Sequence, residues 1–253
     1  MKKRAVKKIF LLMLFMFVSY HTVGHAEPIG VDLNLSVGGQ QAPSEYVGNI
    51  KLLLLLTFLT FIPAIVLLTT SFTRIVIVFG FTRTALSTQQ SPPNQVIIAL
   101  ALFMSLFIMT PVYKEVNSNA IQPYVEGKLS YSQAIEIGSK PVKNFMLNQT
   151  REKDLALFYK VAEYEKPKDR YDVPFTVLIP AFAISEIKTA FQMGFLIFVP
   201  FIVIDMIVAS ILMSMGMFML PPVTVSLPFK ILLFILADGW HLVVKSLLES
   251  FVR

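Results

Sequence analysis

The stretch FQMGFLIFVPFIVIDMIVASILMSMGMFML, residues 191–220, decides the fold class. Its only charged residue is Asp205. About 20 apolar residues, each rising ~1.5 Å in a helix, cross the ~30 Å hydrocarbon core of a bilayer, so this stretch is long enough to span one. We therefore predict an all-α protein of the membrane type, built from helical hairpins.

The end of this stretch has an unusual methionine pattern. Methionines occupy every second position: Met213, Met215, Met217 and Met219. Positions two apart lie roughly 200° apart around a helix, so these residues do not form one helical stripe. We predict a loop or a loosened helix end that presents thioethers on several sides, with Pro221 and Pro222 ending the helix. Methionine also fills gaps in helix cores, which is the alternative interpretation.

Composition supports a membrane protein. Of the 253 residues, 55% are hydrophobic and only 15% are charged, whereas soluble domains usually carry about 25% charged residues. The mean hydropathy is +0.67. The formal net charge is +6, but the basic residues are not clustered as a nucleic-acid partner would require. Membrane lipid is the expected surrounding.

The N-terminus has the three parts of a secretory signal peptide. A basic start (Lys2, Lys3, Arg4) precedes the apolar residues 9–18, and Gly24, His25 and Ala26 follow. We predict a cleaved signal peptide over 1–26, with a polar periplasmic tail over 27–48. An uncleaved anchor is the alternative.

Enzyme chemistry finds little support in the residue inventory. The chain has no cysteine, and His241 is the only histidine after the predicted cleavage site. No nucleophile elbow, metalloprotease helix or phosphate-binding glycine loop is present. We predict a non-enzymatic protein without a metal or cofactor.

Three regions follow the tail. Residues 49–112 are predicted as a first hydrophobic hairpin. Its two apolar segments are 50–81, interrupted by the polar residues 69–71, and 96–112, closed by Pro111. Residues 113–173 are predicted as a water-facing, periplasmic helical insert, since ten Lys/Arg and nine Asp/Glu are mixed there. Amphipathic spacing around Leu155, Phe158 and Tyr159 indicates a surface helix. Residues 174–253 are predicted as a second hairpin with the methionine-rich loop.

The connector of the first hairpin, residues 82–95, contains Arg83 and no acid. With an outside N-terminus, four spanning segments place this connector inside, as the positive-inside rule prefers, and the insert outside. The second half is divided into a short piece, 173–184, and the long run by the polar step 185–188. A polar, proline-containing element of this connector is a candidate functional site between the two helices: Gln89, Gln90, Pro92, Pro93 and Asn94.

Six charges lie in or beside apolar runs: Arg74, Glu186, Lys188, Asp205, Lys230 and Asp238. A charge at the centre of a lipid-facing helix costs about 2.5–3.5 kcal/mol, so these groups should face protein, water or each other. Asp205 and Lys230, from the last two segments, are predicted to pair; contacts between subunits are the alternative. Asp238 with Gly239 is expected to break or bend the final helix.

Deep ionisable groups are also typical of proton-coupled carriers, in which Asp205 and Glu186 would titrate. Breaks at Pro63 and Pro200 would fit the discontinuous helices of such proteins. A small proton-coupled transporter or ion channel subunit is therefore the alternative function. No second half repeats the first, which disfavours it.

Two long stretches carry a family resemblance. Residues 71–112, SFTRIVIVFGFTRTALSTQQSPPNQVIIALALFMSLFIMTPV, and residues 180–240, from PAFAISEIKTAFQMGF to FKILLFILADGW, resemble the FliP/SctP family of flagellar and type III secretion export-gate proteins. They cover about 100 residues, in the right order and with a signal peptide ahead. Residues 27–48 and 113–173 contribute little.

The resemblance implies a pore-forming subunit of the flagellar protein-export gate. In that family, five copies assemble with FliQ and FliR into a cone, beside the export components FlhB and FlhA, and unfolded flagellar subunits pass through its centre. The location implied is the bacterial inner membrane at the flagellar basal body, with part of the assembly displaced toward the periplasm. Apolar helix faces would then pack mainly on neighbouring subunits.

The resemblance also implies residue roles. The methionine gasket of the family matches Met213, Met215, Met217 and Met219, with Phe218 where a further methionine often stands. Arg74, Glu186, Asp205 and Lys230 match the family's charged positions, and the connector element matches as well. Ser87 stands where the family often has glycine.

Overall fold

The computed structural model describes residues 43–164, 167 and 169–251. The predicted signal peptide and residues 27–42 of the tail lie outside the described residues. The chain divides into two compact units, Met1–Thr57 and Phe58–Arg253. All regular structure in the described part is helical, which confirms the all-α fold class.

The first apolar segment forms two helices, which are separated at residues 69–71, the polar interruption seen in the sequence. Helix α2 runs from Pro43 to Leu68 and passes through Pro63 without ending. The hydroxyl of Thr69 donates to the carbonyl of Ile65 (2.9 Å), and that of Thr70 donates to Leu67 (3.3 Å). Such side-chain bonds compete with the helical ladder, and a new helix, α3, covers Phe72–Ala85.

Helix α4 continues past the proline that was expected to close it. It runs from Asn94 to Val116 with Pro111 inside, and a π-helical turn η1 (Asn117–Ile121) and α5 (Gln122–Val125) extend it. The prediction of an end at Pro111 was therefore wrong. A proline removes one helical hydrogen bond, but helices of the membrane type tolerate this loss.

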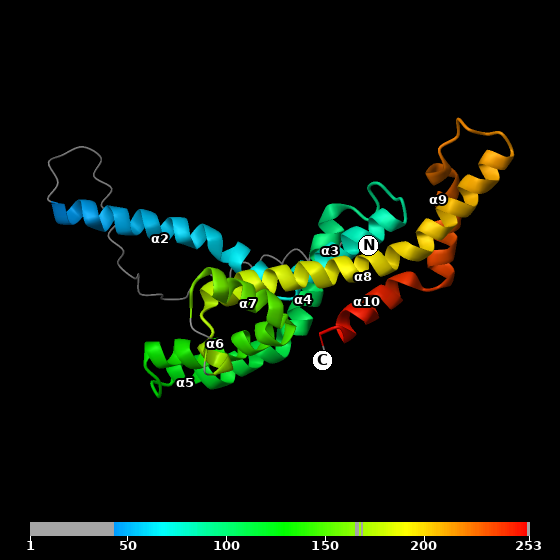
Figure 1. Cartoon of the computed structure of the whole chain (residues 1–253). Coiled ribbons are helices and arrows are strands. Elements are labelled where there is room, and N and C mark those ends of the chain that lie inside the picture. Colours follow the sequence, from blue (N-terminus) through cyan, green and yellow to red (C-terminus); the bar gives the residue numbers. More distant parts are fainter. Residues whose placement is uncertain (1–42, 165–166, 168, 252–253) are drawn as a thin grey trace, which may run out of the picture. The chain divides into compact units, whose positions relative to one another are not determined.

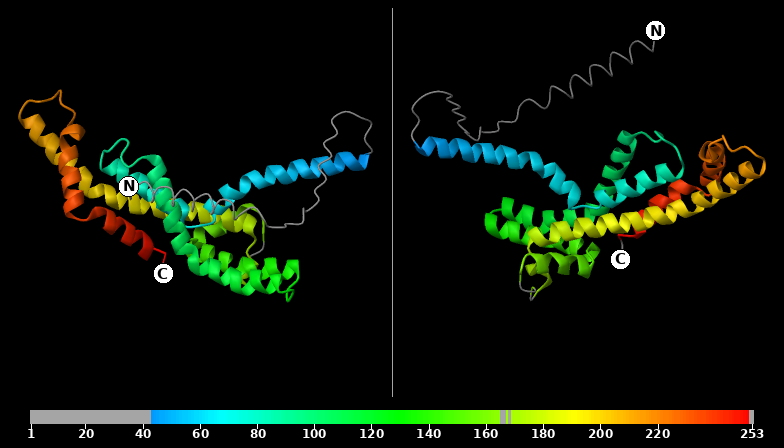
Figure 2. Two further views of the ribbon diagram at one scale, coloured as in Figure 1. Left: turned by 180° about the vertical axis from the view of Figure 1, so that it is seen from behind. Right: turned by 45° about the horizontal axis from the view of Figure 1, so that its top comes forward.

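Helix α8 is the long element against which much of unit 2 packs (Figures 1 and 2). It covers Phe175–Ser214, 40 residues, and contains Pro180 and Pro200 without a break. The predicted division at 185–188 was wrong, because Ser185 and Glu186 are fully buried against protein partners rather than facing water. Pro200 likewise does not produce a discontinuous helix.

Helix α3 lies close along α8. A Cβ added to Gly194 would lie 2.5 Å from the ring of Phe81, so only glycine allows this approach. The central core of unit 2 joins α3, α4, α8 and α10 (Gly239–Glu249). The buried members of this core are Ile75, Val78, Phe79, Ile97, Ala101, Met104, Ala190, Val243 and Leu247.

The insert is mostly helical, as predicted. Helix α6 (Tyr131–Gln149) starts with a capping box between Ser130 and Gln133. Helix α7 (Glu152–Val161) is the expected amphipathic helix, and a 3-10 turn η2 (Arg170–Asp172) precedes α8. Tyr159 of α7 packs with Met146, Leu178 and Phe182 in a second core.

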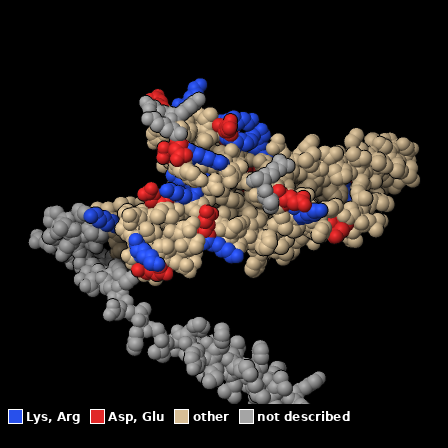
Figure 3. Space-filling view, turned by 90° about the horizontal axis from the view of Figure 1, so that it is seen from below, with Lys and Arg blue, Asp and Glu red and all other residues tan. Residues whose placement is uncertain are grey.

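The last apolar segment is bent. Helix α9 (Pro222–Leu236) and α10 meet at an angle of 62°. Three helical stretches of the described chain, Ile50–Leu68, Asn94–Val125 and Phe175–Ser214, are long and apolar enough to cross a membrane, and the bent pair is a possible fourth. One end of unit 2 carries the α8–α9 turn. On the face shown in Figure 3, this end has almost no charged residues, and the charged residues lie elsewhere on the surface.

Candidate functional site

The methionine-rich loop is the turn between α8 and α9, residues 215–221 (Figure 1). The amide of Met217 donates to the carbonyl of Leu212 (3.0 Å), and that of Gly216 donates to Met213 (3.0 Å). These two bonds form a Schellman motif, and Gly216 takes the left-handed conformation that the motif requires, at φ +75°. The predicted loosened helix end is confirmed.

The prolines act differently from the prediction. Helix α8 ends at Ser214, before the glycine, and Pro222 is the first residue of α9. A proline suits the first helical position, because its missing N–H would be unpaired there anyway. Pro221 and Pro222 therefore begin the second helix and do not end the first.

The bulky side chains of the loop are exposed in the single chain. Their exposed fractions range from 39% for Met217 to 96% for Met219. The alternative of gap filling in this chain's own helix core is therefore not supported. The exposed set is Met213, Met215, Met217, Phe218 and Met219.

A polar network joins the stems of the loop. The ammonium of Lys230 on α9 donates to Oδ2 of Asp205 on α8 at 2.6 Å, as predicted. The hydroxyl of Ser226 donates to Oδ1 of the same carboxylate at 2.5 Å. Lys230 is only 2% exposed and also donates to Oγ of Ser87 at 2.8 Å. The network ties α8 and α9 together between the loop and the α9–α10 bend.

A second network surrounds Arg74, whose side chain is 2% exposed. Its guanidinium forms a bidentate ion pair with the fully buried Glu186: Nε donates to Oε2 (2.9 Å), and Nη2 donates to Oε1. Nη2 also donates to Oε1 of Gln149 (2.9 Å), and Nη1 donates to Oγ of Ser250 (2.9 Å). The ring of Phe251 lies 3.9 Å from the guanidinium carbon. One cation thus joins α3, α6, α8 and the end of α10.

A third cluster connects the insert to α8. The hydroxyl of Ser185 donates to Oδ2 of Asp154 at 2.6 Å, and Nη2 of Arg151 lies 2.5 Å from the same oxygen. Burial raises the pKa of Asp154, but these two hydrogen bonds and the charge of Arg151 outweigh burial and lower the pKa below its ordinary value. The carboxylate therefore stays ionised and holds α7 on α8.

The arrangement combines an exposed apolar tip with a stem held by the ion pair of Asp205 and the buried Lys230. Among the residues that the structure describes, no group of three or more metal-ligating side chains comes together. The sequence model that describes the FliP family matches residues 55–247 of this chain. The chain belongs to the FliP family.

Curated members of the FliP family are similar over most of their length. The flagellar biosynthetic protein FliP of Bacillus subtilis (strain 168) is 55% identical over 217 residues, which are 86% of this chain and 98% of that protein. The Pectobacterium carotovorum FliP is 52% identical over 85% of this chain and 81% of its own. The Caulobacter vibrioides FliP is 48% identical over 87% of this chain and 82% of its own length.

Two of the six predicted charges of this FliP-family chain stand apart from both networks. Lys188 is exposed on α8. Asp238 is exposed and adopts a left-handed conformation, φ +49°, at the α9–α10 bend, which confirms the predicted break. Trp240, next to the bend, packs edge-on against Phe234 (5.4 Å between ring centroids) and Phe79 (6.1 Å).

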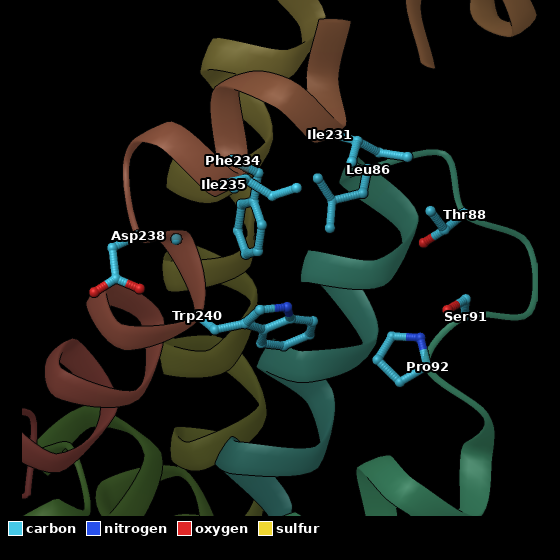
Figure 4. A pocket seen from close by; sticks show the side chains of 10 residues that line it. Leu86, Thr88, Ser91, Pro92, Ile231, Phe234, Ile235, Asp238 and Trp240 are labelled. Atoms are coloured by element: carbon cyan, nitrogen blue, oxygen red, sulfur yellow. The ribbon is translucent and has the colours of Figure 1, made fainter. Parts of the chain in front are cut away.

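The connector element is held at one end by an arginine. Nη1 of Arg83 donates to Oδ1 of Asn94 (2.5 Å) and to the carbonyl of Pro92 (3.3 Å). Gln89 and Gln90 are exposed, and Pro93 directly precedes α4. A cavity of about 400 Å³ separates the connector from the bend, with Pro92 on one side and Trp240 on the other (Figure 4).

Sequence reasoning missed several members of these networks. Ser226 could have been found, because it precedes Lys230 by four residues and therefore shares its helix face. Arg74 and Glu186 were both expected to need partners, but 112 residues separate them and nothing local matched them. Gln149, Ser250 and Phe251 gave no signal.

Proposed function

We propose that this chain is a pore-forming structural subunit of the flagellar type III export gate, which conducts unfolded flagellar subunits across the bacterial inner membrane. The observation that carries this proposal is the exposed α8–α9 turn, where four methionines and Phe218 have little cover from their own chain. Apolar groups gathered on an exposed tip are expected to be covered by other chains.

The tip and its stem suit different tasks. Thioether side chains are flexible and can repack around cargo of varied shape, so they serve as a compliant gasket that blocks small ions when the gate is idle. The stem is held by Asp205, Ser226 and Lys230, whose hydrogen bonds join α8 to α9. A fixed stem keeps the gasket at the pore axis while its side chains move.

Membership of the FliP family places the chain in the flagellar export machinery. We propose that five copies form the pore with FliQ and FliR, next to FlhB and FlhA, at the basal body. The apolar surfaces of α2, α4 and α8 would contact neighbouring subunits and lipid, and the insert would face the periplasm. Energy would come from other components, which fits a sequence without a phosphate-binding glycine loop.

Cysteine chemistry tests this proposal, because the chain contains no cysteine of its own. A Met219→Cys variant, expressed with the whole export apparatus, would be treated with a bulky thiol reagent after assembly. We expect export of flagellar subunits to stop. A Val161→Cys variant is the matched control, since Val161 is also highly exposed (74%) but lies at the end of α7.

Export that continues after complete labelling of Met219→Cys would refute the pore assignment. Vesicles that contain this chain alone provide a second arm. The gate proposal predicts no flux without companion subunits, whereas proton-coupled flux through the isolated chain would favour the transporter alternative.

A further inference from the structure

Ser87 has a backbone conformation that serine rarely adopts. It follows the C-cap of α3, Leu86, and its φ is +58°. This left-handed region brings Cβ close to the backbone and favours glycine. The amide of Ser87 donates to the carbonyl of Thr84 (2.9 Å), so the conformation is part of the turn that ends α3. Glycine would make this turn without strain.

The side chain of Ser87 supplies what glycine lacks. Its Oγ accepts a hydrogen bond from the ammonium of Lys230 at 2.8 Å, across 143 residues of sequence. Lys230 is almost fully buried, and its other hydrogen bond goes to Asp205. A buried ammonium needs acceptors for its three N–H groups. The strained serine therefore contributes one of two acceptors to a charge that water hardly reaches.

The contact connects two parts of the candidate site. Ser87 belongs to the connector between α3 and α4, whereas Lys230 belongs to α9, the second stem of the methionine loop. Leu86 and Thr88, the neighbours of Ser87, line the cavity that Ile231 of α9 also lines (Figure 4). Leu86 and Ile231 line the same cavity, so the start of the connector and α9 face each other across it.

We propose that Ser87 is a positioning residue of the gate. Its hydroxyl fixes the Lys230 ammonium between the connector and Asp205, and thereby holds the α8–α9 stem in register with the end of α3. The role assigned to the stem rests on the proposed function, but the contact between Ser87 and Lys230 is independent of it.

The test is a set of substitutions in the full chain, purified with its companion subunits and melted in detergent. Ser87→Gly removes both the backbone strain and the acceptor, and we expect the melting temperature to fall. Ser87→Asn should restore it, because asparagine tolerates the left-handed region and carries an acceptor oxygen. Glu163→Gly is the control for strain alone: Glu163 has φ +53°, is exposed, and should become slightly more stable as glycine.

The decisive arm repeats Ser87→Gly in the Asp205→Asn/Lys230→Met background, where both charges are absent. The effect of Ser87→Gly should change sign there, since only the relief of strain remains. A stabilising Ser87→Gly in the natural background, or an equal loss in both backgrounds, would overturn the proposal.

Ion conductance of the closed gate separates positioning from stability. We expect conductance to rise in Ser87→Gly and to return to the natural level in Ser87→Asn. Altered melting with unchanged conductance would remove the positioning role. The melting results do not depend on pore function, so failure of the proposed function would leave them intact.

Discussion

Replacing Arg74 by methionine tests how the second charge network supports the fold. Methionine has an apolar side chain about as long as the aliphatic part of arginine, but it lacks the five N–H donors of the guanidinium. Glu186, which is 0% exposed, then keeps a buried carboxylate without its cation. Removing one partner of a buried pair typically costs 3–5 kcal/mol, so we expect a loss of about 4 kcal/mol in the free energy of unfolding.

The other partners of Arg74 add little to this figure. Gln149 and Ser250 are only partly buried, so water can replace the lost hydrogen bonds at small cost. Local effects should still appear at the end of α10, because Nη1 of Arg74 holds Ser250 and the guanidinium lies against Phe251. Amide hydrogen exchange near Ser250 should therefore become faster than in the natural protein.

The assay is unfolding of the purified chain by SDS in mixed micelles, with hydrogen exchange measured in parallel. Arg74→Met/Glu186→Leu is the matched variant, because it removes both charges and should recover most of the loss. A loss below about 1 kcal/mol for Arg74→Met, or a double variant no more stable than the single one, would refute this reasoning.

Three further predictions concern single side chains. Tyr159→Phe should leave the unfolding free energy unchanged or raise it by up to about 1 kcal/mol, because the buried hydroxyl has no hydrogen-bond partner among the described residues; a clear loss would contradict this. The pKa of Asp154 is lowered in the folded protein, so the ionised carboxylate stabilises the fold at pH values above the unfolded pKa of about 3.9. This stabilisation is lost as pH falls through the folded pKa. The difference in stability between the natural protein and Asp154→Asn should therefore close below about pH 4. A gap that persists in acid would reject that assignment. Asp205→Ala leaves Lys230 without its carboxylate and should impair assembly and export, as judged by co-purification of companion subunits and motility, whereas the exposed Glu152→Ala should not. Normal assembly of Asp205→Ala would remove the role of the pair.

The helical class and the loop position could be predicted because they depend on local pattern. Thirty nearly uncharged residues require a helix in an apolar environment, and alternating methionines around Gly216 cannot form one helical face. Asp205 and Lys230 could be paired because they carry opposite charges deep in two adjacent apolar segments. These features need only short-range information.

The unbroken α8 and the Arg74 network could not be predicted, for a different reason. Hydropathy treats Ser185 and Glu186 as a water-facing step, yet both are buried against α7 and α3. Hydropathy cannot separate contact with water from contact with a polar protein partner. The same limit applies to Pro111 and Pro200, where helix continuation depends on the surrounding structure.

Conductance of the closed gate is the most direct test of the gasket. The complete complex, with Met213, Met215, Met217 and Met219 all replaced by alanine, would be compared with the natural complex in planar bilayers. We predict normal assembly and a raised ion leak, since alanine cannot fill the pore. A correctly assembled variant with unchanged conductance would contradict the central claim.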